Sequence, residues 1–280
     1  MTTVEALLRL RHPSMVRQTD IATRETPLRV AMRSLLVVVL FWWSATGLIF
    51  ALQRNPTTRA LGMGLATTLA VWGASLVWLE RDHETASSAR RGFLGAAFLW
   101  TWVQVAFYGG WVIGPESLRV AVPAEPPSWA LAVRAVLAMF WYQLMMLGVM
   151  GLAFRLTWRR ANRIGWWTLV LFWCVHQLAS ISIFLGVENP GRGFFPEPLT
   201  FLESYFGPTR NSWFLLVALA AVLAVTLTMT VRALRDPSPL RRQSLMLLSV
   251  IGALSVLELA VLGTPLNVPL WDAFLAVRGY

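Results

Sequence analysis

Charge is scarce in this sequence, and lysine is missing altogether. Only 14% of the 280 residues are charged, and all 24 basic residues are arginine. A soluble protein of this length needs more charge to cover its surface, so the composition indicates the membrane class. Cysteine is almost absent as well. Cys174 alone cannot form an intramolecular disulfide, and no second thiol exists for a metal site.

Recognisable catalytic motifs are missing too. The sequence has no His-Glu-x-x-His, no glycine-rich phosphate loop and no aspartate-rich metal motif. Its three histidines are His12, His83 and His176, and only His176 falls inside a long apolar run. We therefore predict a protein that is not an enzyme and has no metal site. A small transporter or membrane enzyme of unknown substrate is a less favoured alternative, because ionisable groups and proline breaks are scarce within the apolar runs.

Hydrophobic residues make up 56% of the chain, and they are concentrated in seven runs. Each run approaches or reaches the roughly 20 residues that cross a bilayer core. Backbone groups in lipid must be paired within their own segment, so each run is expected to be an α-helix. The sequence thus predicts an all-α, polytopic integral membrane protein with a bundle of seven transmembrane helices. The predicted spans are Leu35–Leu52, Ala60–Leu79, Gly92–Ile113, Ala130–Ala153, Trp166–Val187, Ser212–Val231 and Leu245–Leu262.

The arginines predict the orientation of these spans. Seventeen of them fall in the N-terminal tail and in alternate loops, and seven fall on the other side. The positive-inside rule then places the N-terminus in the cytoplasm of a bacterium, with the protein in the inner (intracytoplasmic) membrane. Residues 1–34 form a basic cytoplasmic tail, 35–262 the membrane domain and 263–280 a periplasmic tail. Because the arginines lie between spans, the net charge of +10 indicates membrane lipids, and no nucleic acid, as a partner.

An aromatic segment follows the fifth span on the predicted periplasmic side. Pro196 and Pro198 suit a helix start, and Gly207-Pro208 ends the helical pattern, so Pro198–Phe206 is predicted to be a short interfacial helix. Its rings are expected to lie in lipid or to dock on a partner protein, and the sequence leaves both possibilities open. The candidate partner-binding residues are Phe194, Phe195, Leu199, Phe201, Leu202, Tyr205 and Phe206.

Several segments resemble the photosynthetic complex assembly protein PuhE family of purple bacteria. The sequences IFLGVEN and FFPEPLTFLESYF, from 183 to 206, are similar to a Phe-Leu-Gly-Val-x-Asn segment and a Phe-x-Pro…Leu…Ser-Tyr-Phe segment of that family. FWWSATGLIF in the first span and FYGGWVIGP at the end of the third span are similar to two further elements. The resemblance covers roughly 41 to 211.

This resemblance implies a membrane protein that assists assembly of the reaction centre–light-harvesting complex, or associates with it, and influences bacteriochlorophyll levels. Its partners would be reaction-centre and light-harvesting 1 subunits. A permanent, stoichiometric subunit of the same complex is the alternative. The sequence departs from the family at two places, where His-Glu pairs are replaced by Val103-Gln104 and Tyr142-Gln143. Bacteriochlorophyll and carotenoid are the candidate cofactors that the resemblance implies.

Polar side chains within the spans are few enough to consider one at a time. His176 is predicted to bond to Gln104, Gln143 or a backbone carbonyl, while ligation of a bacteriochlorophyll magnesium is the alternative. Antenna histidines have a small residue four positions earlier, where this chain has Phe172. A structural ion pair is expected between Glu258 and Arg134. Gln104, Gln143 and Gln177 are predicted to hydrogen-bond between helices.

Overall fold

The computed structural model describes residues 26–53, 55–122, 126–193 and 195–265, and this part of the chain is helical without a strand. The all-α prediction is therefore confirmed. Most of the predicted N-terminal tail and C-terminal tail lies outside the described residues. The α-helices are α3 (Pro27–Leu52), α4 (Pro56–Glu80), α5 (Ala86–Tyr108), α6 (Trp129–Ala138), α7 (Phe140–Thr157), α8 (Ile164–Leu185), α9 (Trp213–Arg235) and α10 (Pro239–Leu262). Two 3₁₀-helices, η1 (Glu116–Leu118) and η2 (Glu197–Tyr205), complete them.

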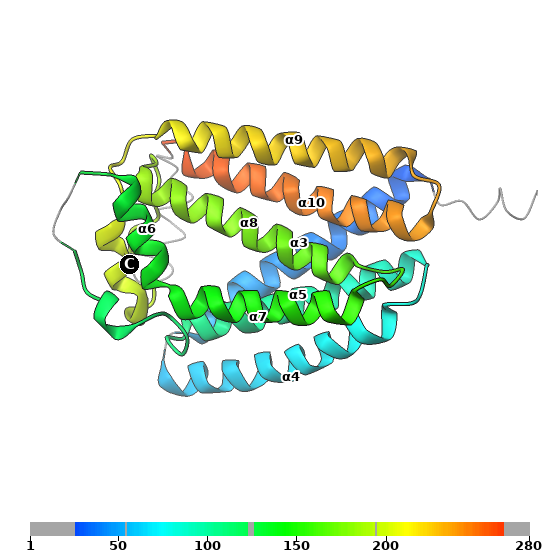
Figure 1. The fold of residues 1–280 in the computed structure, drawn as a ribbon, viewed down its shortest axis with the longest axis horizontal. Helices are drawn as coiled ribbons and strands as arrows, with labels where there is room; N and C mark the ends of the chain where they lie inside the picture. Colours follow the sequence, from blue (N-terminus) through cyan, green and yellow to red (C-terminus); the bar gives the residue numbers. More distant parts are fainter. Residues whose placement is uncertain (1–25, 54, 123–125, 194, 266–280) are drawn as a thin grey trace, which may run out of the picture.

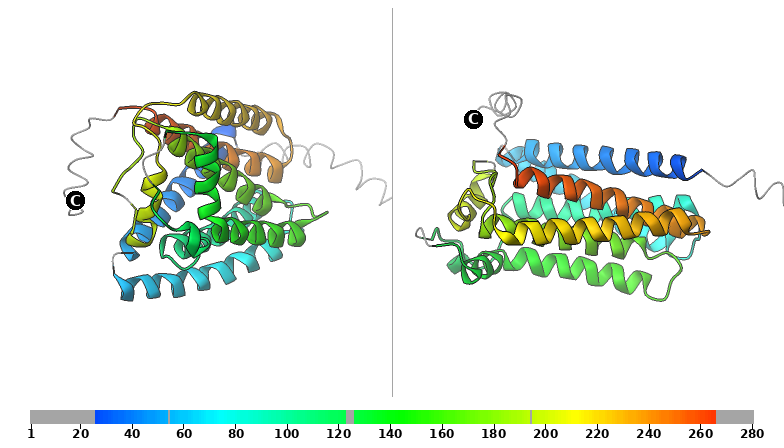
Figure 2. Two further views of the ribbon diagram at one scale, coloured as in Figure 1. Left: turned by 60° about the vertical axis from the view of Figure 1, so that its left-hand side comes forward. Right: turned by 90° about the horizontal axis from the view of Figure 1, so that it is seen from above.

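Seven of the helices lie lengthwise in one bundle, while α6 and η2 lie across one end of it (Figure 1). Helix α5 is central, since it packs against α3, α4, α7, α8 and α10. Figure 2 shows α3 along one side of the bundle, next to α10. Gly73 of α4 and Gly95 of α5 bring two backbones together, because a Cβ on Gly73 would lie only 2.5 Å from the Gly95 carbonyl oxygen. Such small residues permit close helix packing in membranes.

Five helices are long and apolar enough to cross a membrane individually: α3, α4, α8, α9 and α10. The α6–α7 pair passes the same test as one span, which raises the number to six. The protein is thus a multi-pass membrane protein by the length and composition of its helices. The third predicted span, which corresponds to α5, does not pass the test, so the predicted count of seven spans is not confirmed. A helix surrounded by other helices contacts protein rather than lipid, so it can carry more polar and small residues than its neighbours.

The fourth predicted span is broken, contrary to the expectation of one straight helix over Ala130–Ala153. Helices α6 and α7 meet at Met139 with a bend of 69°. A neighbouring loop stabilises the break, because the Tyr142 amide donates to the Ile113 carbonyl at 3.1 Å. Gly114 also packs so closely on the end of α6 that a Cβ there would collide with the Ala138 carbonyl oxygen. The break is therefore a tertiary effect, and no proline causes it.

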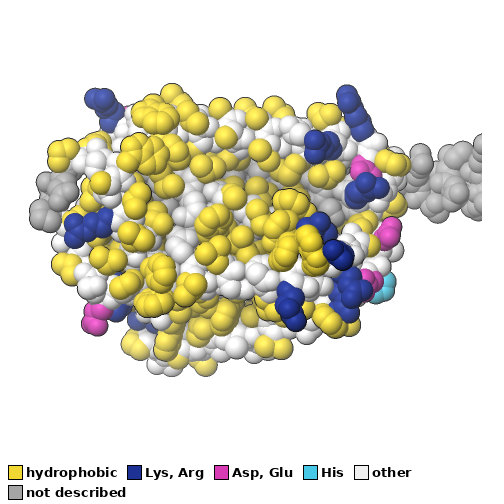
Figure 3. Space-filling model, viewed as in Figure 1, with side chains coloured by type: hydrophobic (Ala, Val, Ile, Leu, Met, Phe, Trp, Pro, Cys, Tyr) yellow, Lys and Arg dark blue, Asp and Glu magenta, His cyan; other side chains and the backbone are white. Residues whose placement is uncertain are grey.

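The exterior has the features of a membrane surface. Charged side chains in Figure 3 gather toward the two ends of the visible face and leave a hydrophobic belt between them. Exposed tryptophans are present near both ends, as expected for rings at the two membrane interfaces. Those near η2 are Trp111, Trp129, Trp141 and Trp213, and those near the opposite end include Trp78, Trp158 and Trp167.

The opposite end is the one at which the larger set of arginines gathers, because α4, α7 and α9 end there and α3, α5, α8 and α10 begin there. Arg91 donates from Nε and Nη2 to the two carboxylate oxygens of Glu80, and this hydrogen bonding raises the pKa of the Arg91 guanidinium. Asn162 joins two loops, since its Nδ2 donates to the carbonyls of Glu80 and Ser88, each at 3.1 Å. Side-chain hydrogen bonds thus link the α4–α5 and α7–α8 loops at this end. Which side of the membrane it faces stays a prediction.

Candidate ligand-binding cavity

The 3₁₀-helices η1 and η2 and helix α6 form a cap that closes one end of the bundle. A cavity with polar lining residues lies next to this cap. Gly110, with a φ of +81°, packs against Pro198, and a Cβ on this glycine would lie 2.8 Å from the proline Cβ. The Val122 amide donates to Ser204 Oγ at 3.0 Å, and the Gly207 amide donates to the Ile183 carbonyl at 3.0 Å. Segments far apart in the sequence therefore hold η2 against the helix ends.

The aromatic segment is buried by its own chain, which corrects the expected exposure of its rings to lipid or a partner. Leu199 and Tyr205 have 0% of their surface exposed, Leu202 2% and Phe206 8%. The predicted short helix over Pro198–Phe206 is a 3₁₀-helix over Glu197–Tyr205. With three residues per turn, Leu199, Leu202 and Tyr205 are stacked on a single face, which packs on the core.

The remaining residues of this segment are less buried. Phe195 and Phe201 are half-buried and pack against the same core cluster. Phe194 lies outside the described residues. The Glu203 carboxylate accepts a 2.8 Å hydrogen bond from the Gly193 amide, while Arg192 donates to the Glu203 backbone carbonyl at 3.1 Å. The cap thus satisfies its own polar groups.

A cavity of about 350 Å³ lies between α3, α5, α8 and α10, next to the cap. Its walls combine aromatic rings with side chains that can hydrogen-bond. Trp42 and Trp100 are stacked with 5.8 Å between ring centroids, and Phe172 lies 4.9 Å from Trp100. The other lining residues are Thr46, Ile49, Gln104, Tyr108, Val175, His176, Ser255 and Glu258.

His176 is brought to the wall of this cavity by α8. Its Nε2 is buried and has no hydrogen-bond partner. Of the partners predicted for His176, Gln104, Gln143 or a backbone carbonyl, none bonds to this nitrogen, and both glutamines are bonded to other side chains. The imidazole instead packs on the Tyr142 ring, with 5.1 Å between ring centroids. A buried unpaired nitrogen is costly and calls for an explanation.

The three glutamines join helices around His176. Gln104 Nε2 donates to the Tyr142 hydroxyl at 3.1 Å and so links α5 to α7. Gln143 and Gln177 form a reciprocal amide pair at 3.1 and 2.9 Å, which links α7 to α8. The Trp173 indole N–H adds a 2.9 Å bond to Gln143 Oε1. The two places at which the sequence lacks His-Glu pairs are thus joined by the Gln104–Tyr142 bond.

Glu258 of α10 does not pair with Arg134, contrary to expectation. Arg134 is an exposed residue of α6, which the bend at Met139 carries across the end of the bundle. Within the described residues, no ion pair or hydrogen bond is formed by the Glu258 carboxyl group. Its side chain is exposed along the cavity wall, so the cavity is not sealed on the α10 side.

A second, smaller cavity of about 120 Å³ adjoins the first and reaches the cap. Tyr108, His176 and Glu258 line both cavities. The smaller one is otherwise bounded by rings and aliphatic groups, including Leu202 and Phe206 of the cap. The segments that resemble the assembly family thus help to enclose the space in front of His176.

Sequence reasoning identified His176, Gln104 and Glu258 but missed the aromatic residues of the cavity. Trp42, Trp100 and Tyr108 look like ordinary interface rings in a chain with 15 tryptophans. A usable signal was the rarity of tyrosine. The chain has only four tyrosines, and two of them, Tyr108 and Tyr142, fall inside predicted spans.

The cavity was compared with the cofactors that the resemblance implies. Among the described residues, no group of three or more His, Cys, Asp or Glu could hold a metal ion. A volume near 350 Å³ is at the lower end of the roughly 300–1,000 Å³ typical of ligand pockets. His176 offers one buried nitrogen without a partner that could ligate a pigment magnesium. Ligation of a bacteriochlorophyll by His176 stays a prediction.

Sequence comparison adds a family to this geometry. The model of the family described as "Protein of unknown function (DUF3623)" matches residues 29–278. The chain belongs to this family. The DUF3623 chain is also 26% identical over 230 residues to a Rhodobacter capsulatus protein described as "Uncharacterized 30.4 kDa protein in puhA 5′region". The match covers 80% of this chain and 82% of the relative. No solved structure matches the chain.

Proposed function

We propose that this DUF3623 protein is a non-enzymatic membrane protein of bacterial photosynthesis. In this proposal it assists assembly of the reaction centre–light-harvesting complex, or associates with it, and influences bacteriochlorophyll levels. The observation that carries the proposal is the similarity, over 80% of the chain, to a protein named for the puhA 5′ region. The segments that resemble the photosynthetic assembly family, one of which contains η2 of the cap, agree with it.

The membrane arrangement in this proposal has seven spans. The central position of α5 and its 23 residues, close in length to the neighbouring helices, favour a seventh crossing despite its lower apolarity. The cap then lies on the periplasmic side of the inner membrane, and the arginine-rich end faces the cytoplasm.

A partner would contact the exposed aromatic residues at the cap end, since the η2 rings are occupied within the chain. Trp111 and Trp213 are 57% and 64% exposed, and Trp129 lies 5.3 Å from Phe214 between ring centroids. Exposed tryptophans anchor rings in the membrane interface and are also frequent energetic centres of protein interfaces. They are therefore the candidate contacts with reaction-centre or light-harvesting 1 subunits.

The test is co-purification of the tagged full-length protein from photosynthetic membranes in mild detergent. Reaction-centre polypeptides are expected to co-purify, and deletion of the gene is expected to lower the near-infrared absorption of the complex. A constant ratio to the reaction centre in mature membranes would indicate a subunit. Enrichment only while complexes are forming would indicate an assembly factor. Absence of co-purification together with unchanged absorption in the deletion strain would refute the proposal.

A further inference from the structure

Three groups around the main cavity have hydrogen-bonding capacity that the described residues leave unused. His176 Nε2 and Trp100 Nε1 are buried without a partner, and the Glu258 carboxyl group lies on the α10 side. Thr46 and Ser255 differ from these, because their hydroxyl groups are paired. Thr46 Oγ1 donates to the Trp42 carbonyl at 2.7 Å, and Ser255 Oγ donates to the Ile251 carbonyl at 2.9 Å. Leaving a buried donor or acceptor unpaired typically costs about 1–3 kcal/mol. A bound molecule with oxygen functions would remove this cost.

The aromatic walls restrict the shape of that molecule. Trp42, Trp100 and Phe172 form a cluster with centroid distances of 4.9 to 6.1 Å, and two of the three ring pairs are tilted. Aromatic surfaces of this kind favour a flat ring, which gains offset or edge contacts with them. The ligand head is thus expected to be a single small ring with polar atoms at its edge.

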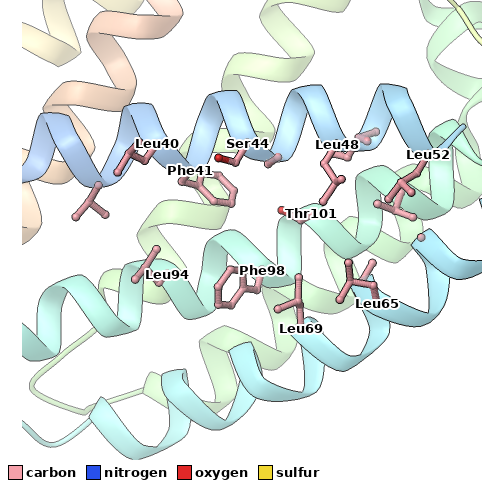
Figure 4. Close-up of a pocket in the computed structure, with 16 residues that line it drawn as sticks. Leu40, Phe41, Ser44, Leu48, Leu52, Leu65, Leu69, Leu94, Phe98 and Thr101 are labelled. Carbon is pink, nitrogen blue, oxygen red and sulfur yellow. The ribbon is translucent and has the colours of Figure 1, made fainter. Parts of the chain in front are cut away.

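An apolar groove lies next to the polar cavity, on another side of helix α3. It has a volume of about 430 Å³ and lies between α3 and the α4–α5 pair. Figure 4 shows Leu40, Phe41 and Leu48 of α3 turned toward α4 and α5. Ile49 lines both this groove and the polar cavity, so the two spaces are neighbours. Apart from Ser44 and Thr101, its walls are built from hydrocarbon and aromatic side chains and glycine.

We propose that the cavity binds the head ring of a quinone or quinol whose isoprenoid tail occupies the apolar groove. His176 Nε2–H donates to one oxygen of the ring. The Glu258 carboxyl group donates to a quinone carbonyl when protonated, or accepts from a quinol hydroxyl when ionised. Trp42, Trp100 and Phe172 pack on the faces of the ring. This molecule is soluble in the bilayer, flat at one end, oxygenated at the ring edge and apolar along its tail. The proposal goes beyond the proposed function, and it rests on that function only for its biological setting.

The ligand test uses the purified full-length protein in nanodiscs made with a quinone-free lipid. Titration with decylubiquinone is expected to quench tryptophan fluorescence with saturation, because Trp42 and Trp100 contact the ring. His176→Ala and Glu258→Ala are each expected to weaken binding by at least about tenfold, because neither alanine can donate to a ring oxygen. The matched controls are His83→Ala, an exposed histidine at the opposite end, and Glu203→Ala, an acidic residue of the cap. Both controls are expected to bind as the unchanged protein does.

The tail is tested separately, with a variant that leaves the polar cavity intact. Leu65 lines the groove and is an exposed residue of α4, so Leu65→Trp is expected to fold. This variant should lose most of the advantage that decylubiquinone has over the same ring without its tail. Non-saturable quenching in the unchanged protein, or equal affinity in the His176 and Glu258 variants and in the controls, would overturn the proposal. So would purification with a bound magnesium bacteriochlorin that His176→Ala removes.

Reaction-centre co-purification on the same variants separates the two proposals. Quinone binding without reaction-centre association would refute the proposed function and leave the ligand assignment standing. Reaction-centre association without saturable quinone binding would refute the ligand assignment and leave the proposed function standing.

Discussion

The ring of His176 lies against the ring of Tyr142, and the hydroxyl of that tyrosine is held by Gln104. This contact fixes the imidazole from one side while its Nε2 has no hydrogen-bond partner. The histidine is therefore positioned by packing and by the neighbour's hydrogen bond. The His176 ring packs on Tyr142, whereas its Nε2 is the atom left for the ligand proposed above.

Removal of the Tyr142 hydroxyl tests this support. Tyr142→Phe keeps the ring contact with His176 but leaves the buried Gln104 amide without its acceptor. We expect the free energy of unfolding to fall by about 1 kcal/mol, the size typical of hydrogen bonds between membrane helices. Unfolding by a denaturing detergent would measure it. The double variant Tyr142→Phe with Gln104→Leu is expected to lose less than the sum of the single changes, and strict additivity would contradict the coupling.

Gly110 tests the attachment of the cap. Gly110→Ala places a Cβ against Pro198 in a residue with a φ of +81°, where a side chain is strained whatever the space. We expect a loss of about 1–3 kcal/mol and faster proteolysis within the cap. Gly148→Ala is the matched control, because a Cβ there meets nothing within 4 Å on helix α7. That control should be neutral or slightly stabilising. Equal behaviour of the two variants would refute the role of Gly110.

Leu202 and Trp213 separate the stability of the cap from partner contact. Leu202→Ala removes a side chain that is 2% exposed, and we expect a loss of about 2–5 kcal/mol in unfolding free energy. Trp213→Ala alters a ring that is 64% exposed, so stability should change by less than about 0.5 kcal/mol. Co-sedimentation with the reaction centre should nevertheless weaken for Trp213→Ala. If only Leu202→Ala affects co-sedimentation, the exposed tryptophans are not the partner contacts.

The orientation in the membrane is tested with reporter fusions. A periplasmic reporter after Tyr280 should be active, and the same reporter in the loop between α7 and α8 should be inactive. The physical reason is the 17-to-7 distribution of arginines between the two sides. A cytoplasmic reporter at both positions serves as the complementary control. Activity of the periplasmic reporter between α7 and α8 would reverse the topology.

The sequence alone was sufficient for the helical class and for the positions of most long helices. A bilayer imposes constraints on each segment separately, because its thickness sets the length of an apolar run and its interior requires local backbone pairing. The arginines of each loop could likewise be counted from the sequence, without knowledge of how the helices pack. Gln143 and Gln177 were also recognisable as polar residues that need partners inside a membrane.

Only the tertiary structure decided where the aromatic segment packs, where the fourth span breaks and which groups face the cavity. Leu199, Leu202 and Tyr205 of η2 are buried because Pro198 and Ser204 contact residues around Gly110 and Val122, far away in sequence. The bend at Met139 depends likewise on the loop at Gly114, and it separates Arg134 from Glu258. Neither glutamine expected to pair with His176 bonds to it, because Gln104 is bonded to Tyr142 and Gln143 to Gln177. Several distant segments could supply the hydrogen-bond partner of each buried polar atom. The local sequence pattern does not show which of them does, because that depends on how the helices pack.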